Sequence, residues 1–245
     1  MQVKLFFIRK TKALFLKMNL HEVFGWMNGF LYNLYYLNKF SEWASKITPN
    51  QYNDFYANQF GSNKRFELYK NIYDIELKND DNINYLEFGV AYGRTFRWWT
   101  DNVKNPNSKF YGFDTFEGLP EDWHLFKKGE MSPDGKYPEI EGDRHQFIKG
   151  LFQETLVHFM KTFKDDKRKV IHLDADLYSS THFVLSILAP YLRKGDILIF
   201  DEFGVPTHEF KSFMEFTSSF YIKYELLSSV NNYFQLAVKI TDMPY

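Results

Sequence analysis

The chain has 245 residues, which is enough for one α/β domain with an N-terminal addition and a large buried core. Its 30 basic and 31 acidic side chains give a net charge of −1, so the chain lacks the basic bias of a nucleic-acid-binding protein. The absence of cysteine excludes disulfides, thiolate metal ligands and cysteine nucleophiles.

The segment up to residue 50 combines basic with aromatic side chains. Its acidic residues are Glu22 and Glu42, and its basic residues are Lys4, Arg9, Lys10, Lys12, Lys17, Lys39 and Lys46. Basic residues interrupt the apolar runs 5–8 and 13–16, so the sequence shows no continuous membrane span or signal-peptide core. We therefore expect a cytoplasmic protein without a transmembrane segment.

An apolar stripe in this segment predicts a helix. Phe24, Met27, Leu31 and Leu34 follow one another at i, i+3, i+7 and i+10. Such a stripe favours packing against the protein's own domain or a second subunit, and we expect a homo-oligomer. Peripheral contact between the basic N-terminus and an anionic membrane is the alternative. With a second helix predicted over 62–77, we interpret residues 1–80 as an N-terminal helical extension that makes oligomer or substrate contacts.

Strand and helix patterns alternate through residues 81–245. Strands are predicted over 84–88, 109–113, part of 145–152, 169–173 and 197–200, with two more around 230–232. Helices are predicted over 94–104, 153–163, 179–192 and 209–218. This alternation predicts an α/β fold with a doubly wound, mostly parallel, Rossmann-like sheet of seven strands and an antiparallel C-terminal hairpin.

A polar insertion over residues 121–143 interrupts the alternation. It follows the carboxyl end of the second strand and has no helical or strand periodicity. Because it leaves the sheet beside the expected ligand crevice, we interpret it as a lid that excludes water and helps to select a substrate. A mobile surface loop without a role is the alternative.

Acidic residues follow two of the buried strands. Asp174 and Asp176 come after the strand 169–173, and Asp201 and Glu202 come after the strand 197–200. The carboxyl ends of neighbouring parallel strands share one crevice, so these four acids should converge. Their mutual repulsion favours a hard divalent cation between them, with Mg²⁺ or Ca²⁺ as the candidates.

A glycine-containing turn follows the first strand of the alternating region. Gly89 and Gly93 permit close backbone approach at the start of a helix, although their spacing does not match a dinucleotide-binding motif. Glu87 precedes the turn and is placed to pair with an amino group. Asp114, with Thr115 beside it, ends the second strand, where acids commonly receive ribose hydroxyls. An amino acid joined to a ribose satisfies this set, and S-adenosyl-L-methionine (S-adenosylmethionine) is such a molecule.

The same residues belong to motifs that resemble the macrocin O-methyltransferase family. These motifs are EFGVAYG (87–93), GFDTFEGLPEDW (112–123), GLFQETL (150–156), HLDADLYSST (172–181) and FDEF (200–203). The resemblance implies a class I methyltransferase that uses S-adenosylmethionine and methylates sugars on natural products. It also implies a Mg²⁺ site, a base and cofactor contacts, at the following positions: Asp174, Asp201 and Glu202 for the metal, Asp176 for the base, and Glu87, Gly89, Gly93, Asp114, Phe152 and Gln153 for the cofactor. This chain has Asp-Glu at 201–202 where many relatives have Asp-Asp.

The leading interpretation is a metal-dependent O-methyltransferase that acts on a hydroxyl of a sugar, a small polyol or a glycosylated metabolite. His208 follows Asp201 on a predicted loop and is a competing candidate base, whereas His172 lies inside a strand and is expected to be a hydrogen-bonded core residue. Two alternatives remain. One is a methyltransferase of the same fold that acts on a catechol-like hydroxyl, and the other is an inactive cofactor-binding or scaffold protein.

Overall fold

The computed structural model describes residues 2–48, 52–123 and 125–244, with side chains described from residue 4 onward. It divides into two compact units, Met1–Ser45 and Lys46–Tyr245. The boundary between them lies inside the predicted extension 1–80, and the helix predicted over 62–77 is part of the larger unit. A separate role for residues 1–80 stays a prediction.

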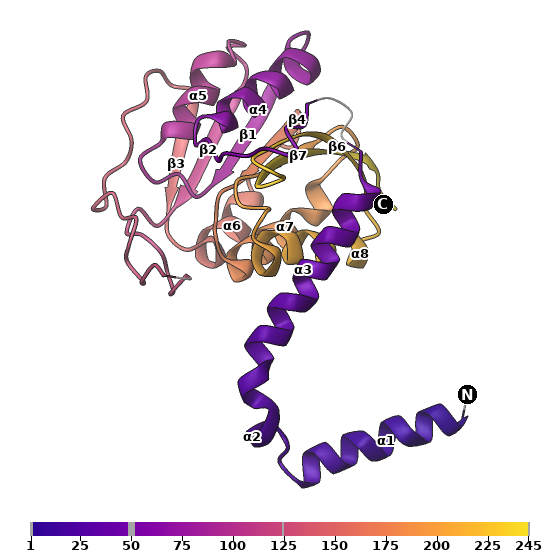
Figure 1. Cartoon of the computed structure of the whole chain (residues 1–245). Coiled ribbons are helices and arrows are strands. Elements are labelled where there is room, and N and C mark those ends of the chain that lie inside the picture. Colours follow the sequence, from indigo (N-terminus) through magenta and orange to yellow (C-terminus); the bar gives the residue numbers. More distant parts are fainter. Residues whose placement is uncertain (1, 49–51, 124, 245) are drawn as a thin grey trace. The chain divides into compact units, whose positions relative to one another are not determined.

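The smaller unit consists of helices joined by short turns (Figure 1). Its elements are α1 (Gln2–Lys17), α2 (His21–Phe24), the 3₁₀ turn η1 (Gly25–Met27) and α3 (Asn28–Lys46). The predicted stripe is interrupted, since η1 separates Phe24 from the part of the stripe on α3. Phe24, Leu31 and Leu34 are exposed. None of the described helices is both long and apolar enough to cross a membrane.

The larger unit is built on a seven-stranded sheet with the strand order β3-β2-β1-β4-β5-β7-β6. The strands are β1 (Ile83–Phe88), β2 (Lys109–Asp114), β3 (His145–Lys149), β4 (Arg168–Leu173), β5 (Ile197–Phe200), β6 (Lys223–Val230) and β7 (Gln235–Asp242). β1 to β5 pair in parallel, whereas β7 pairs antiparallel with both β5 and β6. The predicted fold class is confirmed.

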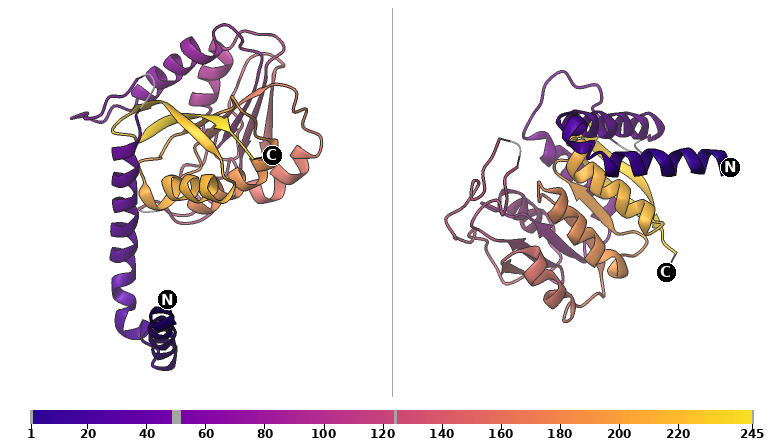
Figure 2. Two further views of the ribbon diagram at one scale, coloured as in Figure 1. Left: turned by 90° about the vertical axis from the view of Figure 1, so that its right-hand side faces the viewer. Right: turned by 90° about the horizontal axis from the view of Figure 1, so that it is seen from below.

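Helices cover both faces of this sheet. α4 (Lys64–Ile72) and α5 (Arg94–Asn102) lie on one face, and α6 (Phe152–Met160), α7 (Tyr178–Leu188) and α8 (Lys211–Ser219) lie on the other (Figures 1 and 2). Short helical turns extend three of them: η2 (Tyr73–Leu77) continues α4, η3 (Ala189–Tyr191) continues α7 and η4 (Pro206–Phe210) precedes α8. The helix predicted over 179–192 therefore ends earlier, where Pro190 cannot donate a backbone hydrogen bond.

Aromatic side chains fill the core on each face of the sheet. On the α4 and α5 face, Tyr85 stacks on Trp99 with ring centroids 5.2 Å apart. On the opposite face, Phe88 stacks on Phe113 at 4.7 Å and meets Phe152 edge to face at 5.4 Å. Residues 85 and 88 lie on opposite faces because side chains alternate along a strand. Burial on both faces holds β1 and its neighbours in register, which fixes where their carboxyl ends lie.

Candidate active site

Two neighbouring strands bring four acidic side chains to the carboxyl edge of the sheet. Asp174 and Asp176 follow β4, and Asp201 and Glu202 follow β5. The two strands pair in parallel, and the Asp201 N–H donates to the Leu173 carbonyl at 3.0 Å. All four acids line one cavity. The structure thus brings together the acids that the sequence placed at two strand ends.

Burial makes this acidic cluster unusual. Burial and the neighbouring Asp201 raise the pKa of Asp174 well above its ordinary value. Burial also raises the pKa of Asp176 and of Asp201. Burial together with the adjoining Asp176 carboxyl group raises the pKa of Glu202 to about 12. Burial therefore favours protonated carboxyl groups in this cluster, whereas positive charge brought to it favours ionised ones.

Arg65 brings one positive charge into the cavity from α4. Its Nη2 atom lies 3.0 Å from Oδ2 of Asp201, whose side chain is only 2% exposed. Arg65 also lines the cavity. Reasoning from sequence missed this residue because no strand end or motif marks it. It reaches the site through the packing of Leu68, Tyr69 and Ile72 from the same helix into the main core.

The cluster has the donor atoms that a hard cation requires. Ligand atoms of His172, Asp174 and Asp201 lie within 4.8 Å of one another. Among the described residues, Asp201 Oδ1 and Glu202 Oε2 are buried without a hydrogen-bond partner. Buried polar atoms normally have partners, and carboxylate oxygens are the ligands that Mg²⁺ prefers. The residues present therefore fit a divalent cation.

His172 lies beneath the cluster and is held by tyrosine hydroxyls. Its Nδ1 atom is 2.9 Å from the Tyr85 hydroxyl, and its Nε2 atom is 3.3 Å from the Tyr69 hydroxyl. Both ring nitrogens thus have partners in the core, as expected for a hydrogen-bonded histidine inside a strand. Metal ligation by His172 would require one of these contacts to break.

The glycine turn after β1 forms the other end of the cavity. Gly89 has a φ of +94°, and a Cβ atom there would lie 1.8 Å from the Asp174 carbonyl oxygen. Only glycine permits this close approach between the tips of β1 and β4. Asp114 secures the turn, because its Oδ2 accepts hydrogen bonds from the Val90 and Ala91 N–H groups, each at 2.7 Å.

Most of the residues predicted to contact a cofactor line the same cavity as the acids. They are Gly89, Asp114, Thr115, Phe152 and Gln153. Phe152 and Gln153 begin α6, and the Thr115 hydroxyl donates to the Gly118 carbonyl at 3.0 Å. The turn and the acidic cluster are therefore two ends of one cavity rather than separate sites.

Three predicted site residues are absent from the described lining of the cavity: Glu87, Gly93 and His208. Glu87 is fully buried, where it accepts hydrogen bonds from the Tyr85 hydroxyl and, at 2.6 Å, from the Thr95 hydroxyl. Gly93 caps the start of α5. His208 lies in η4, and its Nδ1 accepts a hydrogen bond from the Tyr178 N–H at 3.3 Å.

Glu209 is a further buried acid that sequence reasoning did not single out. Its Oε2 atom accepts a hydrogen bond from the Glu202 N–H at 2.9 Å, which fastens the segment after β5 to η4. Burial raises the pKa of Glu209 well above its ordinary value. Glu209 thus positions Glu202 from outside the cavity lining.

Comparison with known families gives a match for residues 86–203, a little under half of the chain, to the model of a methyltransferase domain. The matched segment begins in β1 and ends after β5. It contains every proposed metal and cofactor position. No curated protein matches the chain.

Solved structures with a similar fold include methyltransferases. Calicheamicin methyltransferase CalS11 is 22% identical, with 72% of this chain and 77% of that chain covered and a TM-score of 0.56. The O-methyltransferase NovP is 20% identical, with coverage of 73% and 80% and a TM-score of 0.57. An O-methyltransferase from Bacillus cereus in complex with SAH is 13% identical, with coverage of 90% and 97% and a TM-score of 0.51. At these identities the likeness establishes the fold alone.

Proposed function

We propose that this protein transfers a methyl group from S-adenosylmethionine to a hydroxyl group of a sugar or glycosylated metabolite, with the help of Mg²⁺. The observation that carries the proposal is the single cavity that joins the glycine turn at Gly89 to the acids after β4 and β5. The methyltransferase-domain match supports the reaction class. The SAH complex of the similar Bacillus cereus enzyme supports the choice of methyl donor.

The donor end of the cavity is assigned to the residues around the glycine turn. Gly89 leaves room for the donor's polar groups, and Phe152 offers an apolar surface near the expected adenine position. Asp114 holds the turn through two backbone N–H groups, so its carboxylate shapes the donor site as well as facing it. Glu87 and Gly93 support the turn from outside the cavity lining.

The acceptor end is assigned to the acidic cluster. Asp174, Asp201 and Glu202 would hold Mg²⁺. A divalent cation bound there supplies positive charge that lowers the pKa of a coordinated hydroxyl group. Asp176 is the proposed base: burial raises its pKa, which favours uptake of a proton, and its φ of +57° places it in a strained conformation of the kind found at functional sites.

The reaction is an in-line displacement. The acceptor oxygen forms a bond to the methyl carbon while the carbon–sulfur bond breaks, and the electron pair of that bond remains on sulfur. Asp176 takes the proton of the hydroxyl group. Positioning of the two reactants and general-base help of about 10²–10⁴ in rate account for the acceleration. The choice of a sugar acceptor rests on the motifs that resemble macrocin O-methyltransferases.

Titration calorimetry combined with Asp174→Asn tests this proposal. We expect the unaltered protein to bind S-adenosylmethionine and Mg²⁺, and Asp174→Asn to keep donor binding but lose at least about 10² in turnover of a sugar acceptor because a proposed metal ligand is neutralised. Asp101→Asn, an exposed acid on α5, is the matched control and should retain full turnover.

Two outcomes would overturn parts of the proposal. Full turnover by Asp174→Asn in the presence of a chelator would remove the metal from the mechanism. Binding of NAD in place of S-adenosylmethionine would reject the methyl donor, and with it the reaction.

A further inference from the structure

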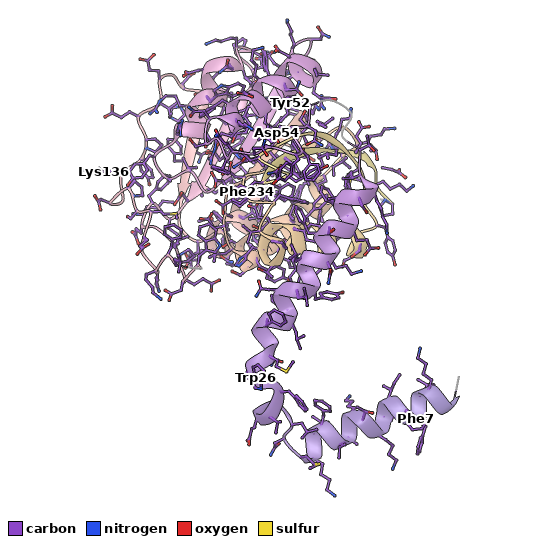
Figure 3. The ribbon with its side chains drawn as sticks, in the orientation of Figure 1. Phe7, Trp26, Tyr52, Asp54, Lys136 and Phe234 are labelled. Atoms are coloured by element: carbon purple, nitrogen blue, oxygen red, sulfur yellow. The ribbon has the colours of Figure 1, made fainter. Side chains whose placement is uncertain are left out.

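Helix α1 is exposed along its whole described length. Every side chain from Lys4 to Lys17 is exposed, including large apolar ones such as Phe7 at 64% and Leu16 at 69%. Figure 3 labels Phe7, whose side chain projects from the α1 ribbon. An isolated helix of this length is marginal in water, and so many exposed apolar side chains indicate a surface that covers them.

Four large apolar side chains of α1 share one sector of the helix, which also contains Thr11 and Lys4. At about 100° per residue, Phe7, Ile8, Leu14 and Phe15 fall within about one third of the helix circumference. Four of the five cations lie outside this sector: Arg9, Lys10, Lys12 and Lys17. Leu5, Phe6 and Leu16 lie among them. Long lysine and arginine side chains can keep their charges in water while their stems cover apolar surface.

The charge of α1 selects among the surfaces that could cover it. The helix carries five cations and no acidic residue. A second copy of α1 would place like charges against each other, which opposes self-association through this helix. An anionic phospholipid surface offers both missing components, since its headgroups attract the cations and the boundary beneath them accepts Phe and Leu side chains.

We propose that α1 binds the surface of membranes that contain anionic phospholipids. The sector that holds Phe7, Ile8, Leu14 and Phe15 faces the acyl chains. The contact is peripheral, because no described helix is suited to spanning a membrane. The proposal is independent of the proposed reaction, since every residue of the candidate active site belongs to the unit Lys46–Tyr245. Its consequence is that methylation would take place close to a membrane surface.

Co-sedimentation of the full chain with lipid vesicles tests the proposal. We expect binding to vesicles of phosphatidylcholine mixed with phosphatidylglycerol, little binding to phosphatidylcholine alone, and weaker binding as salt is added. Lys10→Gln with Lys12→Gln should weaken binding to the anionic vesicles about tenfold or more, because two cations near the surface are lost. Phe7→Gln with Leu14→Gln should weaken it similarly by removing two apolar anchors.

Matched variants separate α1 from general charge effects. Glutamine is a good helix former, so the α1 variants should keep their helix, as far-ultraviolet circular dichroism can verify. Lys161→Gln with Lys164→Gln removes the same charge from exposed positions of the larger unit and should leave vesicle binding unchanged. Equal binding by the control and the two α1 variants, or no binding to anionic vesicles, would overturn the proposal. So would an assembly in solution that sedimentation velocity detects and that Phe7→Gln with Leu14→Gln abolishes.

Discussion

Arg65 shows how one side chain changes the charge of the candidate site. It places a guanidinium group 3.0 Å from the Asp201 carboxylate, which is almost completely buried. Without this positive charge, burial and the nearby acids would favour protonated carboxyl groups in the cluster. The same guanidinium opposes a divalent cation at the proposed metal site, because both are positive. Arg65 therefore stabilises the cluster without a metal and weakens its attraction for one.

Replacing Arg65 with methionine separates these two effects. We expect Arg65→Met to bind Mg²⁺ roughly tenfold more tightly, because a repelling charge is removed. Without metal, the variant should lose roughly 3 kcal/mol of unfolding free energy, since Asp201 is left buried without its partner. Calorimetry measures the first quantity, and urea unfolding in chelator measures the second.

Lys70→Met provides the control for this experiment. Lys70 is on the same helix, but its side chain is 73% exposed and pairs with Asp74 at the surface. It should change neither Mg²⁺ binding nor stability to a comparable extent. Weaker Mg²⁺ binding by Arg65→Met would show instead that Arg65 supports the metal site.

At the scale of an element, the segment before α4 is fastened to the turn between β6 and β7 by Asp54. Its carboxylate accepts hydrogen bonds from Lys64 Nζ at 2.6 Å and from the N–H groups of Asn231 and Asn232 at 3.0 and 3.3 Å. The Asp54 side chain is 9% exposed. Burial alone would raise its pKa, but these partners outweigh burial and lower the pKa below the ordinary value of 3.8.

Asp54→Asn should therefore destabilise the larger unit in a pH-dependent way. We expect a loss of about 2 kcal/mol in unfolding free energy at neutral pH, because charge-assisted hydrogen bonds are removed. Because the pKa of Asp54 is lowered in the folded protein, the stabilisation is complete above pH 3.8, the ordinary pKa of the group. It disappears as the pH falls through the lower pKa of the folded state. The difference in unfolding free energy between Asp54→Asn and the unaltered protein should therefore shrink over that acidic range. Urea unfolding at a series of pH values measures it.

The exposed pair formed by Lys70 and Asp74 supplies the comparison. These side chains are 73% and 39% exposed, so solvent screens their attraction. Asp74→Asn should lower the unfolding free energy much less than Asp54→Asn does at neutral pH. Equal costs for the two variants would mean that Asp54 does not fasten the segment to the turn.

At the scale of the whole molecule, the insertion 121–143 connects the cavity wall with the glycine turn. Met131 lines the cavity, and the Tyr92 hydroxyl from the turn donates to the Ser132 carbonyl at 3.0 Å. The Leu119 N–H donates to the Glu130 carbonyl at 2.9 Å, which ties the insertion to the chain that precedes it. A ligand in the cavity would add contacts to this wall. These contacts support the interpretation of the insertion as a lid.

Limited trypsin digestion with and without S-adenosylhomocysteine tests the lid. Cleavage after the exposed Lys127, Lys128 and Lys136 should slow when the ligand is bound, because local opening then costs more free energy. Cleavage after Lys161 and Lys164, which are exposed but lie outside the cavity lining, should proceed at an unchanged rate. Equal rates at the insertion in both conditions would reject the lid.

Much of the architecture was predictable because it depends on local patterns. The apolar run 197–200 coincides with β5, and the glycines after β1 mark the turn that the structure contains. The positions of Glu87 and His208 were less predictable. Glu87 precedes the turn, but its strand directs it into the core beside Tyr85, and His208 is turned toward the Tyr178 N–H by η4.

The sequence by itself determined the sheet, its crossovers and the acids at its carboxyl edge, because a residue that follows a buried parallel strand must lie at that edge. Only the tertiary structure decided that Arg65 joins those acids and that Asp114 braces the glycine turn. These features depend on contacts between segments far apart in the chain. Such contacts are set by how side chains pack, and no local pattern records them.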